Sequence, residues 1–286
     1  MNLGAAEQWL LEHEPAIRLT LFLGGLLLLA GLERAFPRRA WSLPRLRRQA
    51  ANLGLVVVNT VALRLVLPLA AVGTATLADE RGWGLFGVLD WPRAVEVLLA
   101  VLLLDFAIYL QHVMFHAVPS LWRLHGMHHA DRDFDVTTGP RFHPLEILLS
   151  MGIKLGLVAA LGPAAVAVLI FESLLGVLPL FNHSNVRLPE GLDRVLRLVV
   201  VTPDMHRVHH SVVPAETNSN YGFNVPWWDR LMGTYRAQPD AGHDGMTIGL
   251  SEHQDDRVQS IPWLLAFPFR PAPPSVPVQD SAPETS

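Results

Sequence analysis

Histidine is the residue type in this chain whose spacing could do chemistry. The sequence has 286 residues and 13 histidines. Ten of them fall between residues 112 and 210, in clusters or alone: His112 and His116; His125, His128 and His129; His143; His183; and His206, His209 and His210. Imidazoles three or four residues apart lie on one face of a helix, where they can bind the same metal ion.

A purely structural role does not explain the clusters. A buried imidazole nitrogen without a hydrogen-bond partner costs about 1–3 kcal/mol, and rings packed together in clusters would leave many such nitrogens. We therefore predict that the clustered histidines bind metal. For the isolated His13, His243 and His253, a structural role is favoured.

The available donor atoms narrow the choice of metal. The chain has no cysteine, which excludes disulfides, iron–sulfur clusters and thiolate zinc sites. Imidazole nitrogen suits Fe, Zn, Cu and Ni, whereas Ca²⁺ and Mg²⁺ prefer oxygen. Because one transition-metal ion takes about four to six ligands, nine or ten histidines predict two ions held close together.

The composition predicts an integral membrane protein. Half of the residues are apolar and 17% are charged, against about 25% charged in soluble domains. Four apolar runs, at about residues 16–32, 51–72, 93–115 and 145–181, are each long enough to cross a hydrocarbon core about 30 Å thick. The formal net charge of −4 offers no basic surface, so no nucleic acid partner is expected.

A basic loop between the first two runs sets the predicted orientation. Its arginines are Arg34, Arg38, Arg39, Arg45, Arg47 and Arg48. The positive-inside rule places this loop in the cytoplasm. The second run then crosses outward, the loop at 73–92 has no basic excess, and the third run returns. His112 and His116 are therefore expected at the cytoplasmic face.

The fourth run is predicted to break at Gly162-Pro163. Proline removes a helix hydrogen bond and glycine lowers helix stability. Two helices, at about 145–161 and 164–181, then form a hairpin that is either membrane-spanning or re-entrant, and both versions bring all ten histidines to one side. The predicted fold is an all-α membrane protein with about four transmembrane or re-entrant helices and a cytoplasmic helical cap that carries the dimetal site.

The setting of the site suggests its reaction. A dimetal site that faces hydrocarbon suits activation of O₂ against an unactivated C–H bond, and iron is the redox-active choice. An intramembrane metalloprotease is disfavoured because the sequence has no H-E-x-x-H motif. The other alternative is a non-enzymatic protein that binds or transports transition metals, whose ligands should line a path through the bilayer.

The order of the motifs resembles the fatty acid hydroxylase superfamily, which includes sterol desaturases and the alkylglycerol monooxygenase type. The similar stretches are DFAIYLQHVMFH (105–116), LWRLHGMHH (121–129), RFHPLE (141–146), the N-H-S-N element at 182–185, TPDMHRVHH (202–210) and NYGFNVPWWDRLMGTY (220–235). The resemblance covers about residues 93–236. It implies a membrane-bound di-iron oxygenase or desaturase.

The resemblance also implies the ligands, cofactors and partners. Nine histidines would bind two Fe ions, and His143 is a ligand or lies just outside the ligands. O₂ is the co-substrate, and a separate protein, cytochrome b5-like or a ferredoxin with its reductase, supplies electrons. The substrate is a membrane lipid, either fatty acyl, sterol or related, and the product is either an alcohol or an alkene.

Several further residues are expected to support the site. Asp105 and Tyr109 share a helix stripe with His112 and His116. Asp105 would accept a hydrogen bond from a ligand histidine, or from Arg123 or Arg207. Asn182 and Asn185 would hydrogen-bond a ligand ring or a metal-bound water. A last set is expected to cap the site or to lie at the lipid boundary: Tyr221, Trp227, Trp228, Asp229 and Arg230.

The predicted organisation has four parts. Residues 1–92 form N-terminal transmembrane helices with the basic loop, and residues 93–236 form the catalytic domain. Residues 237–268 are a C-terminal extension, and the Pro- and Ser-rich residues 269–286 are a disordered tail. Lys154 is the only lysine among 22 basic residues; this arginine bias is typical of GC-rich bacterial genomes, so a bacterial inner membrane is expected.

Overall fold

A computed structural model describes residues 4–67, 70–88 and 92–270. All the named secondary-structure elements within these ranges are helices. The helices of the first part are α1 (Ala5–Glu12), α2 (Glu14–Ala35), α3 (Arg45–Val66), α4 (Ala71–Arg81), α5 (Leu85–Val88), α6 (Arg93–Ala117), α7 (Pro119–His129), α8 (Pro144–Leu161) and α9 (Ala165–Asn182). The short helices that follow are α10 (Glu190–Leu196), α11 (Pro203–His209), α12 (Pro214–Thr217), α13 (Trp227–Met232), α14 (Gly242–Gly245), η1 (Asp256–Gln259), α15 (Ile261–Ala266) and η2 (Phe267–Phe269).

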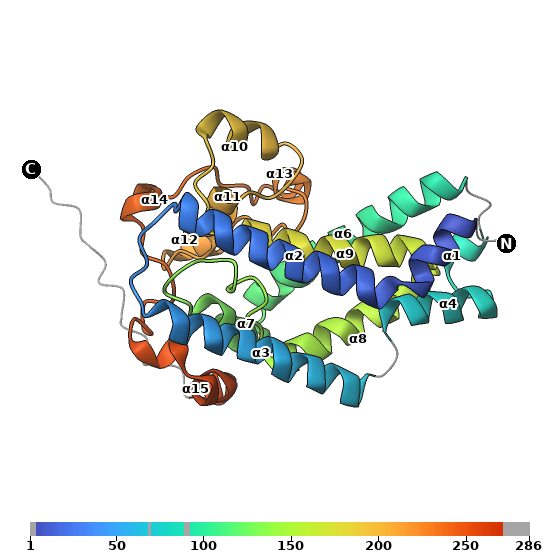
Figure 1. Cartoon of the computed structure of the whole chain (residues 1–286), viewed down its shortest axis with the longest axis horizontal. Coiled ribbons are helices and arrows are strands. Elements are labelled where there is room, and N and C mark those ends of the chain that lie inside the picture. Colours follow the sequence, from blue (N-terminus) through green and yellow to red (C-terminus); the bar gives the residue numbers. More distant parts are fainter. Residues whose placement is uncertain (1–3, 68–69, 89–91, 271–286) are drawn as a thin grey trace, which may run out of the picture.

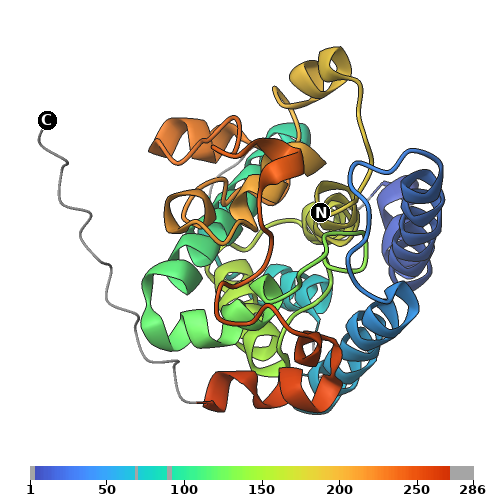
Figure 2. The same cartoon turned by 90° about the vertical axis from the view of Figure 1, so that its left-hand side faces the viewer.

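The long helices form a bundle, and the short helices from α10 onward gather as a cap at one end of it (Figure 1). Helix α9 packs against α2, α4 and α6, while α8 packs against α3 and α4. Figure 2, viewed from the cap end, shows the long helices behind the cap elements. The C-terminal ends of α6 and α9 and the N-terminal end of α8 all meet the cap, so every predicted ligand lies at this end (Figure 1).

The predicted break in the fourth apolar run is confirmed. Helix α8 ends at Leu161 and α9 begins at Ala165. Between them Gly162 adopts φ +59°, and a Cβ placed on it would lie 2.0 Å from the carbonyl oxygen of Trp83. The turn therefore needs a glycine both for its left-handed backbone and for the close approach of residue 83.

The second apolar run differs from its prediction of one span over 51–72. Helix α3 begins earlier, at Arg45, and ends at Val66; residues 68 and 69 lie outside the described residues. Part of the expected loop at 73–92 is also helical, as α4. Ala71, Ala75 and Ala78 are buried on one side of α4, because small side chains at this spacing let it pack closely against α8 and α9.

Five segments of the described chain are long and apolar enough to cross a membrane: α2, the stretch Arg45–Val88, α6, α8 and α9. Their outer faces carry exposed leucines such as Leu27 and Leu98, which lipid would cover. These helices indicate an integral membrane protein. Of the predicted disordered tail, residues 271–286 lie outside the described residues, whereas Phe269 belongs to η2.

Candidate metal centre

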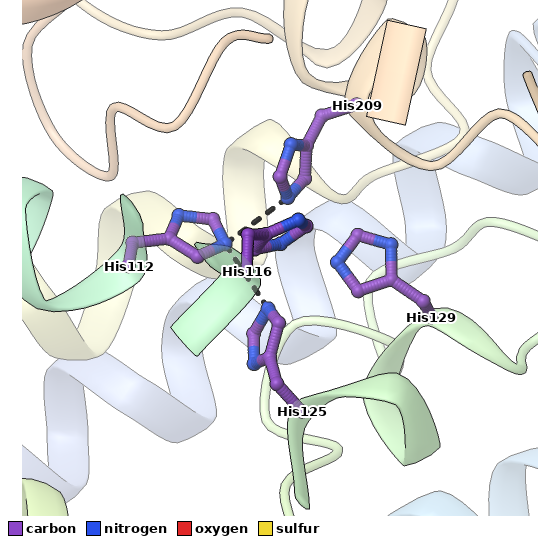
Figure 3. Close-up of side chains that lie close together, drawn as sticks. All are labelled: His112, His116, His125, His129 and His209. Atoms are coloured by element: carbon purple, nitrogen blue, oxygen red, sulfur yellow. Dashed lines mark hydrogen bonds between the residues drawn. The ribbon is translucent and has the colours of Figure 1, made fainter. Parts of the chain in front are cut away.

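Nine histidines converge in the cap as two groups, each able to hold a metal ion. The first, called the five-histidine group, is His112, His116, His125, His129 and His209 (Figure 3). The second, called the four-histidine group, is His128, His183, His206 and His210. Within each group the candidate ligand atoms all lie within 4.8 Å of one another. The nine are the clustered histidines of the sequence together with His183.

Helices α7 and α11 divide their histidines between the groups in opposite ways. On α7, His125 and His129 belong to the five-histidine group and His128 to the other. The second H-x₂-H-H motif reverses this, since His209 alone joins the five-histidine group. At 3.6 residues per turn, residues i and i+4 are only about 40° apart around the helix axis, whereas i+3 and i+4 are about 100° apart, so rings on one side of a short helix can still divide between two ions. The rings of His129 and His210 stack at 4.5 Å between centroids.

Carbonyl and carboxylate oxygens accept hydrogen bonds from the Nδ1 atoms of several rings. The acceptors are Tyr221 O for His112 (2.7 Å), Glu146 Oε1 for His125 (2.7 Å), Arg141 O for His128 (3.0 Å), Pro179 O for His183 (2.8 Å) and Ser219 O for His209 (2.7 Å). A carbonyl oxygen can only accept, so Nδ1 carries the proton and Nε2 keeps its lone pair. These rings are therefore fixed in the tautomer that binds metal through Nε2.

The Nε2 atoms face one another at distances that suit shared ions. Nε2 of His112 lies 3.0 Å from those of His125 and His209, and Nε2 of His183 lies 3.1 Å from that of His128. Two unprotonated nitrogens cannot hydrogen-bond each other. Two nitrogens about 2.1 Å from one ion, at a right angle, are about 3.0 Å apart. The donor atoms thus fit metal ions better than they fit each other.

Burial keeps the cap histidines neutral. It lowers the pKa of His125 and His183 to about 3, and it also lowers the pKa of His129, His209 and His210 well below the usual value, with neighbouring histidines adding to the effect. Both ring nitrogens of His129 and of His210 are buried without a hydrogen-bond partner among the described residues. Neutral, unpartnered imidazole is the form that binds a transition metal.

His143 lies outside both groups. It is the N-cap of α8, where its Nδ1 accepts a hydrogen bond from the backbone N–H of Leu145, and its Nε2 lies 3.1 Å from the carbonyl oxygen of Leu265. Backbone groups thus occupy both ring nitrogens. These contacts leave no ring nitrogen free for a metal, and His143 instead caps the helix that carries Glu146, the partner of His125.

Glu146 is a site residue that the sequence reasoning did not single out. It lies one turn into α8, is buried, and bonds His125 with one carboxylate oxygen while the other has no partner among the described residues. A carboxylate on the outer nitrogen of a ligand histidine orients the ring and makes it a better donor to metal. Only the position of Glu146 three residues after His143 could have signalled it.

The loop that carries Arg141 is held by a buried ionic network. Arg48, expected in the basic loop between two helices, lies instead in α3, where it is fully buried and pairs with Asp131 (2.8 Å) and Asp135. Although burial alone would raise it, Arg48 and Arg141 hold the pKa of Asp131 below its usual value. The network thus holds in place the backbone carbonyl of Arg141, which accepts the hydrogen bond from His128 Nδ1.

Asp105 does not contact a histidine, Arg123 or Arg207, contrary to expectation. Its carboxylate accepts hydrogen bonds from Asn224 Nδ2 and Trp228 Nε1, both at 2.7 Å. Tyr109, on the same stripe of α6, bonds Thr234 at 3.0 Å. Both residues therefore attach α6 to the segment 220–235, and that segment supplies the carbonyl of Tyr221 to His112.

The two asparagines flanking His183 have different roles. Asn182 donates to the carbonyl of Phe223 at 2.8 Å, and its own side-chain oxygen is buried without a partner among the described residues. Asn185 instead binds both backbone groups of Arg39, at 3.0 and 2.7 Å. Neither hydrogen-bonds a ligand ring, and Asn185 holds the α2–α3 connection against the cap.

Of the remaining expected residues, Tyr221 covers the centre and Asp229 holds the backbone beside it. Tyr221 packs edge-on against His112, His116 and His209, and burial raises its pKa to about 12. Asp229 is buried and accepts from the backbone N–H groups of Tyr221 and Gly222, both at 2.8 Å. Trp227 is partly exposed and Arg230 stacks on Tyr235. This segment fixes the backbone that holds His112.

A largely apolar cavity of about 270 Å³ lies between the long helices and is lined at one end by residues that contact the histidine groups. At the cap end its walls include Phe142, Glu146, Pro179 and Phe223. Phe142 stacks on His128 at 4.6 Å and Phe223 packs on His112 at 4.9 Å between ring centroids. The cavity therefore reaches the partners of both histidine groups from the side of the membrane helices.

Comparison with known proteins adds to this geometry. Residues 97–234 match the family model described as fatty acid hydroxylase. This chain carries a fatty acid hydroxylase domain. The domain supplies all nine converging histidines, together with Glu146 and the segment that holds His112. Because the domain's histidines make both groups, its boundaries enclose the whole candidate metal centre.

The relatives of the domain are lipid-modifying proteins. An ornithine lipid hydroxylase of Rhizobium tropici is 36% identical over 151 residues, which are 52% of this chain and 44% of the relative. Human alkylglycerol monooxygenase is 29% identical over 171 residues, 60% of this chain and 37% of the relative. Rat cholesterol 25-hydroxylase is 27% identical over 146 residues, 50% of this chain and 48% of the relative. The match thus spans less than half of each relative, and no solved structure is significantly similar to the chain.

Proposed function

We propose that this chain is a membrane-bound hydroxylase that uses O₂ and two iron ions to oxidise a C–H bond of a lipid. The observation that carries the proposal is the position of the two histidine groups, whose nine converging rings lie directly behind the residues that line one end of an apolar cavity. A hydrolase would have no need to bring its metals to such a cavity. A pocket for a hydrocarbon chain needs apolar walls that end at the reacting atoms.

Each histidine group would hold one iron ion, and when bound the two ions would supply the reduction of O₂ and the oxidation of the substrate. The chain's own residues position the histidine rings and keep water away from the reacting carbon. The backbone carbonyls of Tyr221, Ser219, Arg141 and Pro179 hold the rings in register. Phe142 and Phe223 exclude water from the inner end of the cavity and align the hydrocarbon chain.

Hydroxylation is proposed rather than desaturation. Three relatives from different organisms carry the names hydroxylase or monooxygenase, and all three are named for lipids. Electrons would come from a separate protein, cytochrome b5-like or a ferredoxin with its reductase. We also propose that the cap faces the cytoplasm of a bacterial inner membrane, because Arg34, Arg38 and Arg39 lie at the cap end.

Metal analysis tests the centre. Full-length protein purified in detergent and loaded with ferrous iron should hold about two ions per chain, since each group offers at least the four ligands that one ion needs. The His128→Ala variant, which leaves three ligands in the four-histidine group, should hold fewer, whereas His253→Ala, which changes a histidine outside the groups, should hold two. An iron content below one in the parent chain would overturn the dimetal proposal.

Isotope labelling tests the reaction. Membranes containing the chain, a reductant and ¹⁸O₂ should yield a lipid that carries one ¹⁸O atom, and the His128→Ala variant, which breaks the four-histidine group, should yield almost none. Detection of an unlabelled alkene would show that the reaction is desaturation and that the hydroxylase proposal is wrong. Comparison of lipid extracts from cells with and without the protein identifies the lipid to supply.

A further inference from the structure

A buried group of charges lies along the same cavity, away from the metal centre. Lys154 on α8 bonds one carboxylate oxygen of Glu172 on α9 at 2.5 Å, and Arg18 on α2 bonds the other at 2.8 Å. Arg18 also pairs with Glu14 at 2.7 Å. Lys154 and Glu172 are both nearly fully buried. Charges inside membrane helices are costly and are characteristic of functional sites.

This group lines the cavity together with the residues near the metal centre. Lys154, Glu172 and Arg18 share its wall with Phe142 and Glu146. Glu146 and Lys154 lie on the same helix, eight residues apart, which is roughly 12 Å at about 1.5 Å per residue. The cavity therefore has one end beside the partners of the histidine groups and a charged end, with Ile147 and Met151 and the hydrogen-bonded pair Gln111–Ser150 also in its wall.

The charged end offers unused hydrogen-bond donors, and each oxygen of its buried carboxylate already accepts from a charged group. Both oxygens of Glu172 are taken, by Lys154 and Arg18. An ammonium group has three N–H donors, and among the described residues Lys154 uses one, on Glu172. The positive charges of Lys154 and Arg18 balance the negative charges of Glu172 and Glu14, so the group has no net charge. A neutral hydrogen-bond acceptor would therefore fit this end, because it uses a free donor of Lys154 and adds no charge.

We propose that Lys154 binds the carbonyl oxygen of an ester- or amide-linked acyl lipid whose chain fills the cavity toward the metal centre. The inference rests on the proposed function, because it names the substrate class of that same site. Lys154 is a specificity-determining residue: by fixing the carbonyl roughly 12 Å from Glu146, it selects which carbon of the chain reaches the metals. Glu172 and Arg18 keep the ammonium charged and in place.

Lipid binding, measured by native mass spectrometry, tests the proposal without turnover. The iron-loaded full chain is offered methyl palmitate and n-nonadecane, an alkane of the same number of heavy atoms. We expect about tenfold more bound ester than alkane, the size of effect that one hydrogen bond to a charged donor gives. In Lys154→Met the preference should fall to about one, because Glu172 keeps Arg18 as partner but the donor is gone.

The matched control is Arg93→Met, which breaks the ion pairs with Glu7 and Glu96 away from the cavity and should keep the tenfold preference. If Lys154→Met retains the preference, or the parent chain has none, the inference is wrong. If Lys154→Met fails to hold iron, methyl palmitate bearing a diazirine beside the carbonyl gives the answer in the parent chain. Crosslinks should then fall near Lys154 and Glu172; crosslinks to residues 139–143 would overturn the proposal.

The outcome separates the two proposals. An ester preference that depends on Lys154, in a chain that labels no lipid from ¹⁸O₂, would leave the binding site standing and remove the hydroxylase function. Hydroxylation without any ester preference would leave the hydroxylase function standing and remove the proposed carbonyl site at Lys154. In an active chain, Lys154→Met should also spread hydroxylation of the ester over neighbouring carbons. A mere loss of packing would affect esters and alkanes alike, so a spread confined to esters supports the carbonyl contact.

Discussion

The two histidine groups are built from the same motifs but differ in how firmly the protein holds them. In the five-histidine group, four rings have an Nδ1 partner outside the group, although that of His116 is a long contact of 3.4 Å to Asn218. In the four-histidine group, backbone carbonyls hold His128 and His183, while neither ring nitrogen of His210 has a partner among the described residues.

The groups also differ in exposure. His116 is half-buried and lines an outer pocket with Trp122 and Asn218, whereas every member of the four-histidine group is buried. The five-histidine group therefore has one ligand more than a four-coordinate ion needs, and that ligand is its most exposed. The four-histidine group has no such surplus, so the comparison predicts unequal sensitivity to losing one ring.

Removal of one ligand from each group should give the largest difference. His183→Ala leaves three histidines for its ion, so we expect iron to fall from about two to about one per chain and hydroxylation to fall at least about 100-fold. His116→Ala leaves four, so we expect iron to stay near two with roughly a tenfold loss of rate. Iron analysis and ¹⁸O product counting measure both.

His253→Ala is the control, because His253 lies outside both groups. Equal losses in His183→Ala and His116→Ala would contradict the unequal groups. A larger loss in His116→Ala would show that the exposed ring is the essential one.

The partner of His125 gives a smaller, graded test. Glu146→Leu removes the acceptor of its Nδ1 proton, and loss of such an outer partner typically lowers metal affinity or activity by about 10–100-fold. Glu146→Gln keeps an acceptor oxygen and should lose far less. The corresponding acceptors of the four-histidine group are backbone carbonyls, which side-chain substitution cannot remove. Competition with a chelator measures iron affinity in all three chains.

If Glu146→Gln and Glu146→Leu weaken iron binding equally, the carboxylate acts through its charge. Hydrogen bonding to His125 would then not explain its position.

The sequence was most informative where the signal was local. The spacing of His125, His128 and His129 shows how their rings are arranged around one helix. Gly162-Pro163 marks the turn between α8 and α9. Helix periodicity and helix breaking by glycine and proline both act within one turn of helix. The membrane character followed from apolar runs long enough to span. These features need no knowledge of what packs against them.

Features that depend on packing between distant segments could not be read in this way. The stripe containing Asp105 was visible, but its partner Asn224 is 119 residues away. Which histidines share a group depends on how α7 faces α11, which spacing within either helix does not fix. Arg48 lay in a run of arginines, and nothing local distinguished its buried guanidinium from exposed neighbours.

His143 provides the test with the smallest expected effect, and it bears on whether nine is the complete ligand set. If it only caps α8, His143→Ala should leave iron content and labelling unchanged. It should lower the free energy of unfolding by about 1 kcal/mol, the usual cost of losing an N-cap. His143→Asn, which can still accept from the N–H of Leu145, should recover most of that loss in a thermal unfolding series. A fall in iron as large as that of His116→Ala, without recovery in His143→Asn, would add a tenth ligand and remove the basis for comparing groups of five and four.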